Sequence, residues 1–324
     1  MTAGDLRLCR LEAKIRFITH AKLPFWSGNS LRSGLGARLR DVACINRDHQ
    51  EDCASCHHRM LCVYDSIYNA RILPGKQNLR RTADPPRPFA LMPPIPGYYS
   101  AGAEADFGLA LFGQAQEHLP YFLLALKALG ESGLGSGYRT GMGRFQLGSV
   151  DCLGYGTRSP VLSGDTVFSG QQLAAISYQE ILAASQEHFG EVKLIFKTPA
   201  QIKENGVFTA VPSFRALLSR LLSRANSLAE LYGSGALCSS EEALSLLGQA
   251  RLVAVSSAST RTILAERYFH QQKSEIKPVA PFFIGEITYS GEFSREMMAL
   301  LEMGRYIHVG KMATFGNGAY EISL

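Results

Sequence analysis

Gly304-Arg-Tyr-Ile-His-Val-Gly-Lys-Met-Ala-Thr-Phe-Gly-Asn-Gly-Ala-Tyr-Glu-Ile-Ser-Leu324 is the stretch that decides how the rest of this sequence is interpreted. Gly310, Gly316 and Gly318 lie close together in it, with His308 and Lys311 beside the first glycine. Glycine lets main-chain N–H groups approach a ligand closely, and a run of such groups next to a lysine can cradle phosphate oxygens. The stretch therefore predicts a phosphate-binding loop that leads into a strand. A glycine-rich hairpin with an exposed lysine is the alternative.

Two common nucleotide-binding motifs do not fit this loop. A Walker A loop has four residues between its first glycine and the Gly-Lys pair, whereas five residues separate Gly304 from Gly310. Met312 also stands where a serine or threonine would contact magnesium. The dinucleotide-binding fingerprint opens a helix after a strand, but this loop leads into the strand-like residues 319–322. Nucleotide hydrolysis and NAD binding are therefore disfavoured.

The order of predicted elements is the same in the two halves of the chain. Residues 10–18 alternate apolar with charged side chains, as in a half-buried strand, and residues 30–42 carry a helical apolar stripe. The second half runs strand 191–197, helix 213–232, strands 252–256 and 282–289, helix 294–303, glycine-rich loop and strand. This βαββαβ order is that of a ferredoxin-like domain, so we predict an α+β protein with two such RRM-like domains in tandem. A chain of 324 residues is long enough for both cores.

Composition suggests where the two domains begin and end. The first domain is predicted over residues 1–155 and contains a cysteine-rich insertion (44–62). It also contains a segment (83–100) with six prolines, which exclude a helix or a central strand, so we expect this segment on the surface. The second domain is predicted over residues 165–324 and contains the glycine-rich loop (304–318). The hinge is expected within 154–170, which is rich in Gly, Ser and Thr. A second helix, glycine-rich turn and strand at 117–147 resembles the arrangement at the end of the chain.

Charge and hydropathy limit the kinds of partner. There are 33 basic and 28 acidic residues, a net charge of +5 with neutral histidines, which permits a polyanionic partner without requiring one. The start of the sequence has no signal-peptide core. The longest apolar run, residues 121–129, is too short to cross a membrane and contains Lys127. We expect a cytoplasmic protein with no membrane partner.

Four of the seven cysteines, Cys44, Cys53, Cys56 and Cys62, are bunched in one segment. In a reducing compartment such bunching indicates a metal rather than disulfides, and a Cys-x2-Cys pair can reach one tetrahedral ion from a tight turn. The four cysteines predict a structural zinc site. An iron–sulfur cluster and reduced, unliganded cysteines stay open as alternatives.

The sequence resembles one known family at several places. Residues 306–320 are similar to the C-terminal glycine-rich signature of the CRISPR-associated endoribonucleases that process precursor crRNA, members of the RAMP superfamily. Ser30-Leu-Arg-Ser-Gly-Leu-Gly-Ala-Arg-Leu-Arg40 resembles the first-helix motif of that family. Lys197-Thr-Pro-Ala-Gln-Ile-Lys203 is similar to its Thr-Pro-x-Arg-x-Lys segment, although Ala200-Gln201 replaces the expected arginine. Family members carry two ferredoxin-like domains side by side, in agreement with the order of elements.

The resemblance implies a prokaryotic endoribonuclease that binds CRISPR repeat RNA and cleaves precursor crRNA with no cofactor required for catalysis. In that reaction a ribose 2′-hydroxyl attacks the adjacent phosphate, and a 2′,3′-cyclic phosphate end is left. The expected partners are repeat RNA, crRNA and subunits of a CRISPR effector complex. A non-catalytic RAMP-type crRNA-binding subunit is the main alternative function, and a zinc-organised protein–protein module is the third.

The implied reaction needs a proton-transfer group and a positive charge beside the phosphate. His308 is the first candidate acid or base because it lies within the glycine-rich signature, and Lys311 would stabilise the phosphorane. Several family members keep their catalytic histidine just after the first helix, where this chain has His49, His57 and His58. The predicted RNA contacts are loop glycines and basic side chains from both halves: Gly310, Gly316, Gly318, Arg32, Arg40, Lys197, Lys203, Arg220, Arg224 and Arg261.

Overall fold

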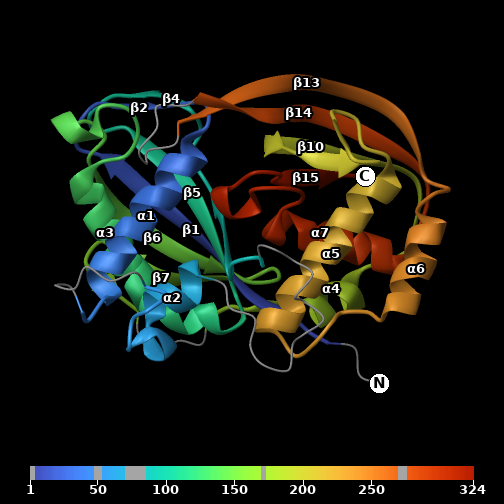
Figure 1. The fold of residues 1–324 in the computed structure, drawn as a ribbon, viewed down its shortest axis with the longest axis horizontal. Helices are drawn as coiled ribbons and strands as arrows, with labels where there is room; N and C mark the ends of the chain where they lie inside the picture. Colours follow the sequence, from blue (N-terminus) through green and yellow to red (C-terminus); the bar gives the residue numbers. More distant parts are fainter. Residues whose placement is uncertain (1–3, 47–52, 70–84, 169–172, 269–275) are drawn as a thin grey trace. The chain divides into compact units, whose positions relative to one another are not determined.

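The structure is a computed structural model that describes residues 4–46, 53–69, 85–168, 173–268 and 276–324. The described chain forms two compact units. The first unit comprises residues 4–177 together with 227–235, and the second comprises residues 178–226 and 236–324. Each unit contains its own antiparallel sheet and helices (Figure 1).

The first unit is built around strand β1 (Arg7–Phe17), whose apolar side chains are buried while its charged side chains are not, as its alternating sequence predicts. β1 pairs with β5 (Glu104–Phe112) on one side and with β6 (Phe145–Leu153) on the other. β3 (Phe89–Met92) pairs with the far side of β5. The resulting order β3-β5-β1-β6 is that of a ferredoxin-like sheet, so the predicted fold of the first half is confirmed.

Further strands enlarge this sheet. β7 (Arg158–Ser163) and β8 (Thr166–Val167) continue it beyond β6, and β9 (Ile176–Ser177) pairs with the first residues of β1. Residues 158–167, within the stretch that the sequence suggested as a hinge, therefore belong to the first sheet. A small separate sheet is formed by β2 (Ala21–Leu23) and β4 (Gly97–Tyr99).

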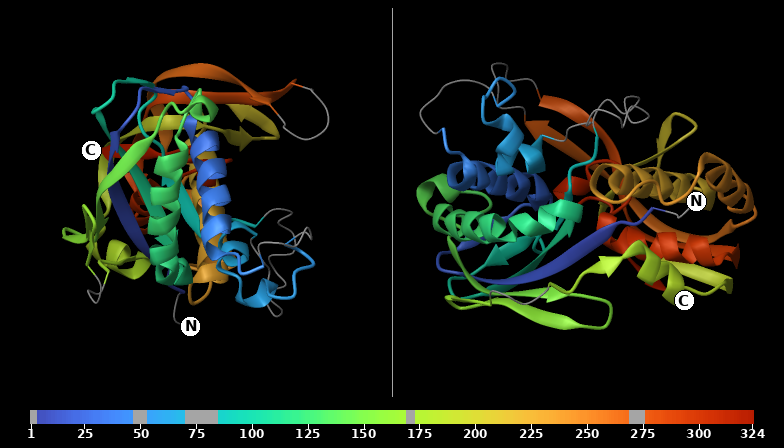
Figure 2. Two further views of the ribbon diagram at one scale, coloured as in Figure 1. Left: turned by 90° about the vertical axis from the view of Figure 1, so that its left-hand side faces the viewer. Right: turned by 90° about the horizontal axis from the view of Figure 1, so that it is seen from below.

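Helices α1 (Ser27–Ala43) and α3 (Leu119–Ser132) run side by side over one face of the first sheet (Figure 2). α1 turns Leu31, Leu35 and Leu39 into the core, which matches the apolar stripe seen in its sequence. The short helix α2 (Val63–Tyr68) packs against α1. The ring of Tyr68 lies so close to Gly36 that a side chain at Gly36 would clash with it.

The proline-rich segment contains a buried strand, and our prediction that it lies on the surface is wrong in this respect. Phe89 and Leu91 of β3 are fully buried although prolines flank the strand on both sides. β3 is an edge strand, which prolines tolerate because the outer edge needs no ladder hydrogen bonds. The core of this unit thus extends further along the chain than its composition suggested.

The second unit has the same topology. Its central strand β10 (His188–Ala200) buries Val192, Leu194 and Phe196 in alternation. The order β13-β14-β10-β15 again matches a ferredoxin-like sheet and confirms the predicted fold of the second half. The other strands of this unit are β11 (Ile202–Glu204), β12 (Val207–Thr209), β13 (Ala254–Tyr268), β14 (Ile276–Phe293) and β15 (Tyr320–Ser323).

Two long helices follow the order that the sequence predicted. α5 (Phe214–Tyr232) follows the small β11–β12 hairpin, and α7 (Arg295–Ile307) precedes the glycine-rich loop. The Oγ of Ser294 accepts a hydrogen bond from the first turn of α7 and so sets the start of that helix. α4 (Tyr178–Ala184) packs against α7, and α6 (Ser240–Gln249) was not foreseen. None of the helices in the described ranges is both long and apolar enough to cross a membrane.

The β13–β14 hairpin is longer than its sequence indicated. The two strands pair from Ala254 opposite Ser290 to Tyr268 opposite Ile276, with irregular register at two places along β13. β13 forms one edge of its sheet, and residues 254–259 are exposed on both faces. Their Ala and Ser side chains carry little hydrophobic alternation, so only a short strand was predicted there.

Candidate nucleic-acid interface

The glycine-rich loop between α7 and β15 closes on itself through the main chain. The Val309 N–H donates to the Gly318 carbonyl oxygen at 3.0 Å, and the Gly318 N–H donates to the Pro199 carbonyl oxygen at 2.9 Å. The Lys311 N–H donates to the carbonyl oxygen of Gln201 at 3.1 Å. These N–H groups are therefore used within the unit, and the phosphate cradle that we expected from them is not formed by these three groups.

Thr198 fastens the other side of the loop to β10. Its Oγ1 donates to the Gly316 carbonyl oxygen at 2.6 Å and accepts from the Ala319 N–H at 2.9 Å. A β-carbon at Gly318, where φ is +71°, would clash with the Val309 carbonyl oxygen. We had attributed the loop glycines to close approach of RNA. The packing at Gly318 instead gives that glycine a structural role.

The first unit contains a loop of the same design between α3 and β6. The Leu134 N–H donates to the Gly143 carbonyl oxygen at 2.9 Å, which repeats the bond that closes the second loop. The Ser136 N–H donates to the Lys22 carbonyl oxygen at 2.8 Å, as Lys311 does to Gln201. A 3₁₀ turn follows in each loop, over Tyr138–Thr140 and Ala313–Phe315. The similarity of the two glycine-rich stretches in sequence therefore extends to their hydrogen bonds.

At two positions with positive φ, the first loop has glycine and the second loop has a residue with a side chain. Gly133 ends α3 with φ 89° and ψ 157°, and His308 ends α7 with φ 62° and ψ 165°. Gly137 and Met312 both precede the 3₁₀ turn in the left-handed region. A side chain at such positions costs about 1–3 kcal/mol, and residues of this kind cluster at functional sites. His308 and Met312 thus keep side chains where the first loop avoids the strain.

Basic side chains converge beside this strained loop. The Nζ atoms of Lys203 and Lys311 lie 5.3 Å and 5.2 Å from the ring centroid of Phe208. The Nη2 of Arg220 on α5 donates to the Lys203 carbonyl oxygen at 2.9 Å. Lys203, Lys311 and Arg220 are exposed, and Phe208 is half-buried. We call these four residues the basic cluster; it brings together three of the residues predicted from the sequence.

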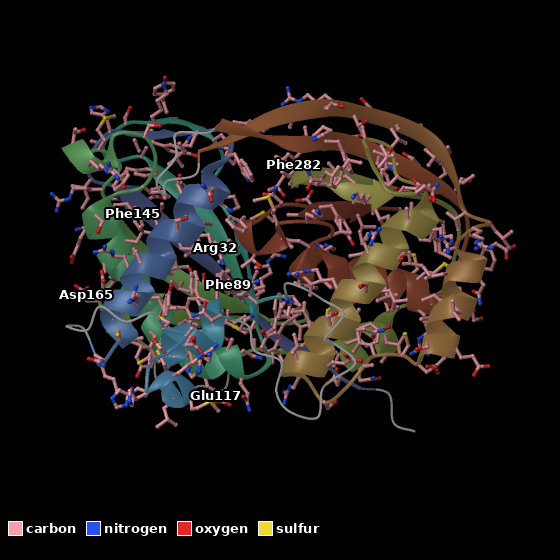
Figure 3. All side chains as sticks on the ribbon, in the orientation of Figure 1. Arg32, Phe89, Glu117, Phe145, Asp165 and Phe282 are labelled. Carbon is pink, nitrogen blue, oxygen red and sulfur yellow. The ribbon has the colours of Figure 1, made fainter. Side chains whose placement is uncertain are left out.

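The other predicted basic residues lie outside this cluster. The Nζ of Lys197 lies 2.9 Å from a carboxylate oxygen of Glu321. The Nε of Arg224 donates to the last carbonyl of α7, that of Ile307, at 2.6 Å, which is a helix-capping contact. The remaining three lie on elements that the cluster does not use. Arg32 lies on α1 (Figure 3), with its Cζ 5.2 Å from the ring centroid of Tyr68. Arg40 is exposed near the end of α1, and Arg261 is exposed on β13.

Tyr320 is an unsuitable acid or base although it directly follows the loop. Burial raises the pKa of its hydroxyl well above the ordinary value. The hydroxyl therefore stays protonated and donates to the Leu301 carbonyl oxygen at 2.7 Å. Tyr320 anchors β15 to α7.

Comparison with solved structures shows which proteins share this fold. A Cas6 protein in a product complex has a TM-score of 0.54 and 18% identity, over 98% of this chain and 100% of that one. A Thermus thermophilus Cas6 protein in a product complex has a TM-score of 0.55 and 17% identity over the same shares. A chain of a partial Cas6-RT-Cas1–Cas2 complex has a TM-score of 0.57 and 14% identity, over 99% of this chain and 46% of that one. No curated protein matches the sequence.

Family models agree with the structural comparison. The model described as CRISPR-associated endoribonuclease Cas6 matches residues 194–320, and the model AF_1859_N, described as an N-terminal domain, matches residues 6–177. Over residues 194–320 the chain matches the Cas6 family. The family predicted from the glycine-rich signature is thereby confirmed.

The candidate histidines differ in accessibility. The side chain of His308 is buried, with 3% of its surface exposed. His57 and His58 are exposed and lie between α1 and α2, within the cysteine segment. His49 lies outside the described residues. Direct proton transfer by His308 would therefore require the loop to uncover its ring, whereas His57 and His58 need no such movement.

The four bunched cysteines lie around one small cavity of about 20 Å³ in the first unit. Cys44 directly follows α1, and Cys62 directly precedes α2. In the described part of the chain, no group of three or more His, Cys, Asp or Glu side chains is placed so that it could already hold a metal ion. The spacing thus predicted the gathering of the thiols, and zinc binding stays a prediction.

Two residues of the site escaped the sequence analysis. Phe208 has no motif around it, and only the fold brings it between Lys203 and Lys311. Met312 was considered only as a mismatch to the Walker A pattern. Aligning the two glycine-rich stretches of this sequence would have shown Met312 and His308 opposite Gly137 and Gly133.

The closed loop leads to a test of glycine packing. Gly318→Ala should destabilise the second unit strongly, because it combines a positive φ with a clash against the Val309 carbonyl. Gly206→Ala is the matched control, since Gly206 has φ +85° but open space around its α-carbon. The control should cost about 1–2 kcal/mol, and Gly318→Ala about 1–3 kcal/mol more. Equal losses in chemical denaturation would contradict the packing role.

Proposed function

We propose that this protein is a metal-independent endoribonuclease that binds CRISPR repeat RNA and cleaves precursor crRNA. The observation that carries the proposal is the basic cluster beside the strained glycine-rich loop, in a chain that matches the Cas6 family over residues 194–320. We further propose that crRNA and subunits of CRISPR complexes are its partners. The solved relatives support this, because their names describe product complexes and a Cas6-RT-Cas1–Cas2 complex.

The basic cluster is suited to an RNA phosphate. Two ammonium groups close to one aromatic ring repel each other, and an anion between them removes that repulsion. Phe208 attracts both groups by cation–π interaction and so restricts where they lie. Because the lysines are exposed, a phosphodiester can reach them without rearrangement of the unit.

The proposed chemistry forms and breaks one bond at phosphorus. The 2′-hydroxyl oxygen attacks the adjacent phosphate while a base takes its proton, and the 5′ oxygen leaves after an acid protonates it. We assign His308 as the first candidate for proton transfer and Lys311 to stabilisation of the phosphorane. His57 and His58 are the second candidates because they are exposed. The backbone strain at His308, at a position where the first loop has glycine, supports the first assignment.

One observation favours a second function. His308 is almost completely buried, as expected for a structural histidine in a non-catalytic crRNA-binding subunit. Such a subunit would keep the basic cluster and bind repeat RNA without cleaving it.

Cleavage of repeat RNA from the protein's own CRISPR array separates these functions. We expect cleavage in EDTA, a 2′,3′-cyclic phosphate on the upstream product, and no cleavage of RNA with a single 2′-deoxy substitution next to the scissile phosphate. The 2′-deoxy RNA should still bind. A strict need for a divalent metal would overturn the mechanism, and tight binding without any cleavage would favour the non-catalytic subunit.

A pair of glycine substitutions tests the role of His308. Met312→Gly should relieve strain, raise the free energy of unfolding by about 1 kcal/mol and leave cleavage intact. His308→Gly relieves the same kind of strain but should slow cleavage by about 10²–10⁴-fold, with repeat-RNA affinity nearly unchanged. If His308→Gly cleaves like the parent, His49, His57 and His58 are to be replaced singly. Parental rates in all four variants would refute a histidine mechanism.

Binding titrations at several salt concentrations test the basic cluster. Lys203→Ala and Lys311→Ala should each weaken RNA binding and reduce the slope of log affinity against log salt by about one. Lys193→Ala is the control, because Lys193 is a partly exposed lysine on β10 of the same unit that pairs with Glu286 at 3.6 Å. Unchanged slopes in both cluster variants would place the RNA elsewhere.

A further inference from the structure

We propose that Cys44, Cys53, Cys56 and Cys62 bind one structural Zn²⁺ ion that fastens the cysteine segment to the end of α1. All four side chains line the same cavity of about 20 Å³. A cavity of this size has room for about one water molecule, so it suits one ion and excludes a larger ligand. Four thiolates in tetrahedral arrangement are a typical ligand set for structural zinc.

Hydrophobic burial does not explain how the cysteine segment is held. None of residues 53–62 is buried, and Met60 and Leu61 are 76% and 90% exposed. The segment nevertheless forms defined turns and a 3₁₀ helix (Arg59–Leu61) between α1 and α2. Hydrogen bonds such as that from Arg59 Nη1 to the Ala54 carbonyl oxygen, at 3.2 Å, hold the segment locally. The four cysteines form no disulfides, so a bound metal ion is the cross-link that their side chains could supply.

The charges around the cavity fit a zinc–thiolate centre. Four thiolates with one Zn²⁺ carry a net negative charge, and the side chains of Arg40 and Arg59 line the same cavity. The Nε of Arg59 lies 3.4 Å from the carboxylate of Asp65, which is 1% exposed and which also accepts from Asn69 at 2.8 Å. Arg59 is thereby fixed beside the thiols, where its charge offsets theirs.

Zinc binding requires the cysteine side chains to turn toward one another. As placed in the structure they do not form a coordination shell, and the Cys44 Sγ lies 3.5 Å from the Asn46 carbonyl oxygen. A cysteine Sγ is moved by one torsion, between staggered rotamers, without movement of the backbone. Deprotonation of the thiols accompanies binding, so zinc affinity should fall at low pH.

The position of the site explains what the ion would do. Cys44 is the residue after α1 and Cys62 the residue before α2, so one ion joins the ends of both helices. α1 in turn packs Leu35 and Leu39 into the core of the first unit. Zinc is thus assigned a role in folding of the first unit, independent of RNA cleavage.

Metal analysis of the purified, untagged protein tests this assignment. We expect about one zinc per chain by inductively coupled plasma mass spectrometry. After removal of zinc by a chelator, added Co²⁺ should give the thiolate charge-transfer and tetrahedral d–d absorption bands. Cys53→Ser and Cys56→Ser should each lose the zinc and lower the melting temperature, while the matched control Cys238→Ser, outside the segment, keeps it.

The unsubstituted protein decides the question even if the variants fail to fold. Absence of zinc together with absence of the Co²⁺ thiolate bands would overturn the proposal. Iron with acid-labile sulfide in place of zinc would overturn it too, and so would full zinc content in folded Cys53→Ser or Cys56→Ser.

Discussion

The fourth strand of each ferredoxin-like unit can reach its sheet only because the loop before it closes on itself. A helix has just ended, and the chain must reverse before it pairs with the first strand. One main-chain bond makes this reversal in each unit, from Val309 to Gly318 and from Leu134 to Gly143. The carbonyls of Pro199 and Gln201, at the end of the central strand, then fix the second loop. The register of β15 and the position of Lys311 depend on this closure.

Because the loop occurs twice, features that belong to the fold can be distinguished from features that only the second loop has. Since both loops share the closing bond and the 3₁₀ turn, those features belong to the fold. The first loop adopts the same backbone with glycine at the positions of His308 and Met312, so the backbone path itself does not require a side chain there. Strain that one copy avoids and the other keeps is a physical reason to search for function there.

Much of the fold was predictable because strong periodic patterns determined it. The alternation in β1 and the apolar stripe of α1 gave the correct element types for these two segments, and the sequence of predicted elements gave the βαββαβ order. β3 was missed because its flanking prolines masked a strand that lies at a sheet edge. The length of β13 was missed because Ala and Ser side chains show no hydrophobic period. In the candidate site, Lys203 and Lys311 were each predicted from the sequence as residues that act on the RNA. The position of Phe208 between them was not predicted, because it depends on contacts between residues that are distant in the sequence.

The exposed edge of β13 has a consequence for solubility. A long edge strand offers unpaired main-chain groups to any other extended chain and is a common starting point for aggregation. Here the register is irregular between Val255 and Ser257 and again between Ile263 and Ala265, so the regular ladder is interrupted. The intervening residues are mostly Ser, Thr and Ala, with Arg261 among them. Over residues 254–263 the edge therefore offers a foreign strand an interrupted ladder and little apolar surface, two features that disfavour edge-to-edge association.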